Sequence, residues 1–146
     1  MHAAVGSMKA LKEYGKVNVQ TGIMNASPYR LIQMLLEGAV DRIAQAKGHL
    51  QRQEIRQKGE AISTAVSIIG GLRDSLDKSS GGEIAENLDS LYEYMSTRLV
   101  EANVKNDISI LNEVYNLLME IKEAWDAIEN HPDVIEHTEK PQPSAA

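Results

Sequence analysis

Residues 81–107, GGEIAENLDSLYEYMSTRLVEANVKND, decide the fold of this chain. A pair of glycines opens the segment, and Asn106-Asp107 closes it. Between these ends, apolar residues recur at the spacing that places them on one face of a helix. The residues of that face are Ile84, Leu88, Leu91, Met95 and Ala102. Arg98 and Leu99 share the one remaining position, between Met95 and Ala102. The segment therefore predicts an amphipathic helix over about residues 83–103, one side of which packs against other helices.

Three more helices of the same kind are predicted around this one. Ser27-Pro28 marks the start of a helix that continues to about residue 50, because serine is a favoured N-cap and proline suits the first helical position. A second helix covers about residues 55–76 and carries Lys58 at one polar position of its apolar face. Asp107 caps the last helix. The three apolar faces are Ile32, Leu36, Ala39, Ile43, Ala46 and Leu50; Ile55, Ile62, Ala65, Ile69, Leu72 and Leu76; and Leu111, Val114, Leu118, Ile121, Trp125 and Ile128.

Short connections between such helices favour an all-α, antiparallel four-helix bundle over residues 27–130. Residues 8–26 are expected to form a lead-in segment that packs against the bundle, with a short helix over 8–14. Residues 131–146 contain three of the four prolines among polar neighbours, and we expect them to be a disordered tail. Residues 1–7 are interpreted as a vector-derived extension, and the predicted fold does not include them.

Composition narrows the function further. The chain has 146 residues, the size of one domain, and a net charge of −6 from 21 acidic and 15 basic residues. No basic patch is visible, so nucleic acid is not expected as a partner. No apolar run approaches the ~20 residues of a membrane helix, so membrane insertion is not expected. The absence of cysteine excludes disulfides and thiolate chemistry and fits a reducing compartment.

No catalytic, cofactor-binding or metal-binding constellation is predicted, so the chain is not expected to be an enzyme. No glutamate is followed by a histidine three residues later, as a di-iron bundle requires. The alternative from another class is a histidine phosphotransfer protein that uses His49. Arg52 and Gln53 replace the lysine and the small residue that such a domain places near its histidine. A solvated surface histidine is therefore the favoured interpretation of His49.

More apolar residues flank the four helical faces than a narrow seam uses. Much of this surplus is expected to widen the core. Its extent on the last two helices also predicts an exposed patch or groove for a partner. A homodimer interface, formed when no partner is bound, is the alternative use of that patch. The surplus residues are Leu31, Met34, Leu35, Val40, Val66, Ile68, Tyr92, Tyr94, Leu99, Ile108, Ile110, Tyr115 and Leu117.

Two blocks of sequence resemble a known family. The first contains NASP at 25–28, LI at 31–32 and MLLEGA at 34–39. The second is the 81–103 segment, and Asp107, Leu111, Glu113-Val114, Leu117-Leu118 and Ala124-Trp125 continue its pattern. Together and in this order they resemble the flagellin export chaperone family, FliS. Two departures are Leu36, where the family usually has tyrosine, and Asn25, where it has threonine.

The resemblance implies a cytoplasmic chaperone that performs no chemistry. It would bind the disordered C-terminal segment of flagellin, prevent premature polymerisation and engage the flagellar type III export gate. The N-terminal segment over 11–23 is expected to fill the binding groove until a partner displaces it. Met95 also faces the predicted core. The residues predicted to contact cargo are Tyr14, Ile23, Leu35, Tyr92, Met95, Leu99 and Tyr115.

Overall fold

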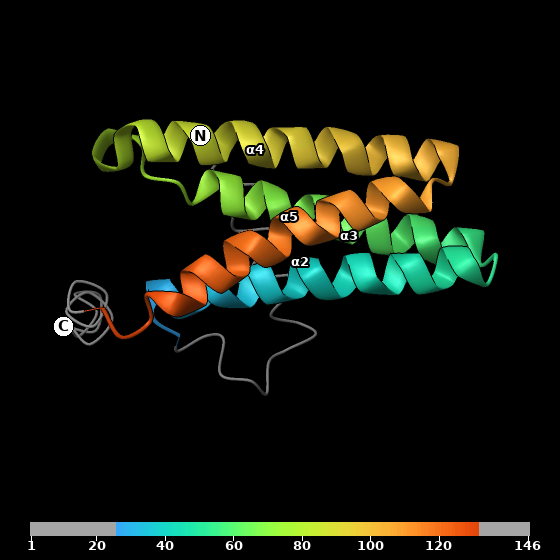
Figure 1. Ribbon diagram of the computed structural model, residues 1–146, viewed down its shortest axis with the longest axis horizontal. Helices are drawn as coiled ribbons and strands as arrows, with labels where there is room; N and C mark the ends of the chain where they lie inside the picture. Colours follow the sequence, from blue (N-terminus) through green and yellow to red (C-terminus); the bar gives the residue numbers. More distant parts are fainter. Residues whose placement is uncertain (1–25, 132–146) are drawn as a thin grey trace.

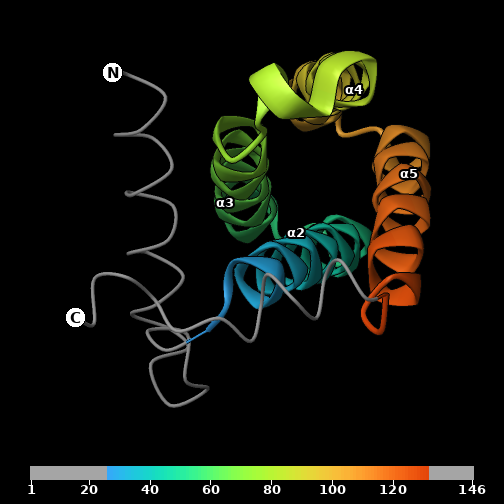
Figure 2. The same ribbon diagram turned by 90° about the vertical axis from the view of Figure 1, so that its left-hand side faces the viewer.

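The computed structural model describes residues 26–131, which form four helices (Figure 1). They are α2 (Pro28–Gln51), α3 (Ile55–Asp74), α4 (Lys78–Lys105) and α5 (Ile108–Ala127). Seen from one end, the helices occupy the corners of a square (Figure 2). α2 and α4 lie at opposite corners, and each packs against both α3 and α5. The predicted all-α bundle is confirmed.

Local capping bonds start the helices where the sequence predicts. The Ser27 hydroxyl oxygen accepts a hydrogen bond of 3.1 Å from the Arg30 backbone N–H, and Pro28 is the first residue of α2. At the start of α5, the Asp107 carboxylate accepts one of 2.9 Å from the Ser109 backbone N–H. Each bond satisfies a backbone donor that has no partner inside its helix.

The connection between α3 and α4 differs from the prediction. α3 ends at Asp74 instead of residue 76, and α4 begins at Lys78 instead of residue 83. The Asp77 carboxylate caps α4 by accepting hydrogen bonds from two successive backbone N–H groups. Gly82 then interrupts α4 with φ +55° and ψ −130°, a conformation that glycine adopts without a steric penalty. Gly82 therefore forms a kink within α4, whereas the sequence predicts a helix that begins after both glycines.

The core runs along the inner faces of all four helices. On α4 the buried residues are Ala85, Tyr92, Met95, Leu99 and Ala102, and Leu88 and Leu91 pack against the core. The face predicted for α4 is therefore largely confirmed, with Ala85 and Tyr92 added to it. Ile84, which was predicted to face the core, has a side chain that is 72% exposed. Successive helical residues point about 100° apart, so the wide apolar stripe allowed either flank to face inward. The surplus residues Met34, Leu35, Val40, Ile68 and Ile110 are also buried.

Two other predicted core residues are exposed because they lie at helix ends. Ile55 is the first residue of α3, and Ile128 follows the end of α5. Lys58, by contrast, is a charged residue inside the bundle, with a side chain only 2% exposed. Its ammonium group donates hydrogen bonds to the backbone carbonyl of Asn103, at 2.9 Å, and to the side-chain oxygen of Asn106. Lys58 therefore ties the start of α3 to the end of α4.

Candidate partner-binding groove

An apolar groove of about 380 Å³ lies at one end of the bundle. This is the end where α2 and α4 begin and where α3 and α5 finish, and it faces the reader in Figure 2. Residues from all four helices and from the α3–α4 connection line the groove, so it exists only in the assembled bundle. The lining residues are Ile32, Leu36, Leu72, Ser75, Leu76, Asp77, Ser80, Gly81, Ile84, Ala85, Leu88, Tyr92, Ile121 and Trp125.

The floor and the rim of this groove differ in exposure. Leu36, Leu72 and Tyr92 are buried and belong to the core beneath it. Ile84 stands exposed beside them. Complete burial of an aliphatic side chain of this size contributes about 1.5–3 kcal/mol. A partner that covered Ile84 would therefore gain free energy that the isolated bundle does not use.

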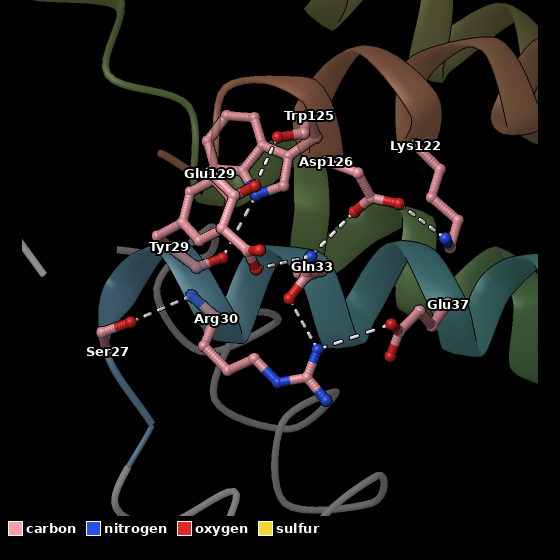
Figure 3. A network of polar contacts seen from close by, with 9 residues as sticks. All are labelled: Ser27, Tyr29, Arg30, Gln33, Glu37, Lys122, Trp125, Asp126 and Glu129. Atoms are coloured by element: carbon pink, nitrogen blue, oxygen red, sulfur yellow. Dashed lines mark hydrogen bonds and ion pairs between the residues drawn. The ribbon is translucent and has the colours of Figure 1, made fainter. Parts of the chain in front are cut away.

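An aromatic pair fixes one wall of the groove (Figure 3). The rings of Tyr29 and Trp125 stack with centroids 4.9 Å apart and an interplanar angle of 11°. The Trp125 indole N–H donates a hydrogen bond of 3.2 Å to the Tyr29 backbone carbonyl, and the Tyr29 hydroxyl donates one to the Trp125 carbonyl. The beginning of α2 is therefore joined to the end of α5 by one stacking contact and two reciprocal hydrogen bonds.

Polar contacts beside the aromatic pair continue this join (Figure 3). The buried Gln33 amide donates a hydrogen bond of 2.8 Å to the Asp126 carboxylate and accepts one of 2.6 Å from the Arg30 guanidinium. Lys122 pairs with the same aspartate at 2.7 Å. The Lys122 and Gln33 side chains lower the pKa of the Asp126 carboxyl. Because these side chains come from α2 and α5, they hold that wall in one arrangement.

The groove contains one of the seven residues predicted to contact cargo. Tyr92 lines its floor, and burial raises the pKa of the tyrosine to about 12. Leu35, Met95 and Leu99 are buried in the core away from the groove lining. Tyr115 is half-buried on α5, with the Lys47 ammonium 4.6 Å from its ring centroid. Tyr14 and Ile23 lie outside the described residues.

Sequence reasoning predicted a groove but missed most of its lining, because it assigned several of the lining residues to the core. Ile84, Ile121 and Trp125 all belonged to predicted inward faces. Their apolar character was the available signal, but nothing in the order of residues indicated that the core opens at this end of the bundle.

His49 lies in the last turn of α2, at the other end of the bundle. Its Nδ1 atom is 2.8 Å from the Glu54 carboxylate, which also accepts a hydrogen bond of 2.9 Å from Arg52. The His49 and Arg52 side chains lower the pKa of Glu54. The imidazole is thus half-buried in a local ion cluster instead of standing free in solvent.

Residues 26–131 hold no group of three or more histidine or acidic side chains arranged to bind a metal ion. Within the same range, no helix is long and apolar enough to cross a membrane.

Comparison with known proteins agrees with the family that the sequence motifs resemble. The family described as flagellar protein FliS matches residues 10–132. The flagellar secretion chaperone FliSB of Pseudomonas aeruginosa is 52% identical over 122 residues, which cover 84% of this chain and 97% of that protein. The flagellar secretion chaperone FliS of Salmonella typhimurium is 45% identical over 119 residues, covering 81% and 88%. The protein of that name from Bacillus subtilis is 31% identical over 106 residues, covering 73% and 78%. The chain belongs to the FliS family.

Proposed function

We propose that this protein is an export chaperone that binds the disordered C-terminal segment of flagellin in the cytoplasm. By covering that segment it prevents premature polymerisation and supports delivery to the flagellar type III export apparatus. The apolar groove across all four helices is the observation that carries the proposal. The relatives named flagellar secretion chaperones support the same role.

The groove suits a partner that has no fixed structure of its own. Grooves between helices accept an amphipathic helix or an extended chain through a few apolar anchors. A disordered segment loses conformational entropy when it orders, so part of the free energy gained by burial is spent on that ordering. Binding of this kind is specific and reversible, as a chaperone that must release its cargo requires.

The geometry of the groove supports a proposal for the contact residues. We assign the rim contact to Ile84 and the floor contact to Tyr92, with Trp125 as the wall. The predicted contacts Leu35, Met95 and Leu99 are covered by neighbouring helices, so a cargo would reach them only if the bundle opened. Direct contact by these three residues, and by Tyr14, Ile23 and Tyr115, stays a prediction.

The first test is calorimetric titration with the C-terminal ~40–50 residues of flagellin, a length set by the ~30 Å bundle and the reach of an extended or helical chain. We expect saturable one-to-one binding with a strongly negative heat-capacity change, the mark of apolar burial coupled to ordering. Absence of binding, confirmed by a second method such as fluorescence anisotropy, would refute the proposal.

A pair of matched variants locates the site. Ile84→Glu places a carboxylate at the groove, whereas Val104→Glu makes a comparable change at the other end of α4. The two side chains are 72% and 77% exposed, so both variants should fold with unchanged helicity. We expect Ile84→Glu to weaken flagellin binding roughly 10- to 100-fold, from lost apolar burial and the desolvation of a charge, with Val104→Glu close to the parent. Equal losses in the two variants would place the site elsewhere.

A further inference from the structure

The charge of the bundle is distributed unevenly along its long axis. The half that contains the groove consists of residues 26–39, 65–92 and 118–131, and it holds ten carboxylates and four basic side chains. The other half, residues 40–64 and 93–117, holds seven of each. The excess of six negative charges within the described residues therefore lies entirely in the half that contains the groove.

The two halves also differ in how their carboxylates are paired. In the half without the groove, Asp41 is the one carboxylate that makes no ion pair or side-chain hydrogen bond within residues 26–131. In the other half, five make no such contact with the described residues. They are Asp74, Glu83, Glu86, Glu120 and Glu123.

These five carboxylates lie beside the groove in the chain. Glu83 and Glu86 bracket the lining residues Ile84 and Ala85, and Glu120 directly precedes the lining residue Ile121. Asp74 directly precedes the lining residue Ser75, and Glu123 lies two residues before Trp125. Glu83, Glu86, Glu120 and Glu123 are exposed. The half of the bundle that contains the groove therefore carries the unpaired negative charge of these five side chains, each of them one or two residues from a lining residue, and we call this set the acidic rim.

We propose that the groove recognises a cargo segment in which apolar anchors are flanked by lysine or arginine side chains. The proposal rests on the function proposed above and adds the chemistry of the cargo that the site selects. The apolar lining would take the anchors, and the acidic rim would attract the basic side chains beside them. A segment of the same apolar content with flanking acidic residues would be repelled.

The physical reason is the range of the field. At physiological ionic strength the screening length is about 8 Å, so several unpaired carboxylates around one groove act together on a charge at its edge. Such a field raises the rate of encounter and discriminates between partners more than it adds to the final affinity. The contribution of the acidic rim to binding must therefore fall as the salt concentration rises, whereas the contribution from burial of the apolar anchors must not.

The protein-side test compares two double variants that each remove two negative charges. Glu83→Gln/Glu86→Gln neutralises the rim on α4, and Asp41→Asn/Glu60→Gln does the same in the other half, on exposed side chains. The probe is the flagellin C-terminal peptide, titrated at 50 mM and at 1 M NaCl. At low salt we expect the rim variant to bind roughly three- to tenfold more weakly and the control to match the parent. At 1 M NaCl, where the screening length is about 3 Å, all three proteins should bind alike.

The cargo-side test replaces every lysine and arginine of the peptide by glutamine. This peptide should bind the parent protein more weakly at low salt and should no longer distinguish the rim variant from the control. If the unmodified peptide binds and neither the rim variant nor salt changes its affinity, the charge proposal is wrong and the chaperone proposal stands. If the unmodified peptide does not bind at all, the chaperone proposal itself fails. Circular dichroism of each variant excludes loss of the fold as the cause.

Discussion

Replacement of the buried lysine is the sharpest test of how the bundle is held together away from the groove. Lys58→Met keeps most of the length and volume of the side chain and removes its charge and its donors. In the parent protein the ammonium group lies in a site where it meets two neutral oxygens, the carbonyl of Asn103 and the side chain of Asn106. It forms no ion pair with a carboxylate of the described residues. The substitution leaves both oxygens without this donor.

The size of the effect follows from three contributions. Two hydrogen bonds from a charged donor stabilise by about 1.5–3 kcal/mol each. The positive charge at the carboxyl end of α4 adds about 0.3–1 kcal/mol through the helix dipole. Against these stands the desolvation of the ammonium group, which costs several kcal/mol and lowers the pKa of Lys58. The sum predicts that Lys58→Met lowers the free energy of unfolding by about 2 kcal/mol.

Urea denaturation at pH 7, followed by circular dichroism, measures this change. With a slope of about 1–2 kcal/mol per molar urea, the midpoint should fall by about 1–2 M. Flagellin binding at temperatures where both proteins are folded should be unchanged, because the groove lies at the opposite end of the bundle. A variant as stable as the parent, or more stable, would refute the reasoning, since burial of the charge would then cost more than its hydrogen bonds return.

The same lysine predicts a dependence on alkaline pH. Below its lowered pKa, Lys58 is charged in both states, and the folded protein bears the full cost of burying the charge. Between that pKa and 10.5, the folded protein has released the proton and the unfolded chain still holds it. Unfolding then takes up a proton, so stability rises with pH relative to Lys58→Met. Denaturation of both proteins from pH 7 to 10.5 checks the sign, and a difference that shrinks with pH would contradict it.

Three further predictions concern the groove end of the bundle and the helices around it. Tyr29→Phe keeps the ring against Trp125 but removes the hydroxyl donor, so we expect a loss of about 1 kcal/mol in the free energy of unfolding and an altered tryptophan fluorescence. An unchanged fluorescence spectrum and an unchanged denaturation midpoint would contradict the proposed role of the Tyr29 hydroxyl. Gly70→Ala should raise the free energy of unfolding by about 0.5–1 kcal/mol, because a Cβ at this position meets nothing within 4 Å and alanine favours the helix. Thermal denaturation measures the change in stability, and a lower midpoint would show that α3 needs the glycine. Hydrogen bonds from Ser79 and Ser80 lower the pKa of Asp77 from 3.8 to about 2, so the Asp77 cap stabilises α4 fully above pH 3.8 and loses this effect as the pH falls through 2. Hydrogen exchange of the first turn of α4, measured across this pH range, should show the loss. Asp77→Ala should abolish the pH dependence.

Some parts of this protein follow from residues close together in the chain. The starts of α2 and α5 are set by Ser27 and Asp107, whose side chains bond backbone groups two or three residues ahead. Such bonds need no tertiary contact, so the sequence alone predicts them. The helical class of the fold follows in the same way from the spacing of the apolar residues. The family motifs add the expected function because they keep their order along the chain.

The site depended on the tertiary structure. Ile84 and Ala85 are neighbours in an apolar stripe, and only the packing of α4 against α3 and α5 decided that alanine faces inward and isoleucine stands at the groove. The groove needs Ile32 and Trp125 side by side, although more than ninety residues separate them. The acidic rim likewise gathers carboxylates from α3, α4 and α5 at one end because the helices alternate in direction. The spacing of apolar residues and the capping of helices act over a few residues and can be predicted from the sequence. Which side of a helix faces the core, and which charges from different helices lie at the same end of the bundle, depend on the tertiary structure.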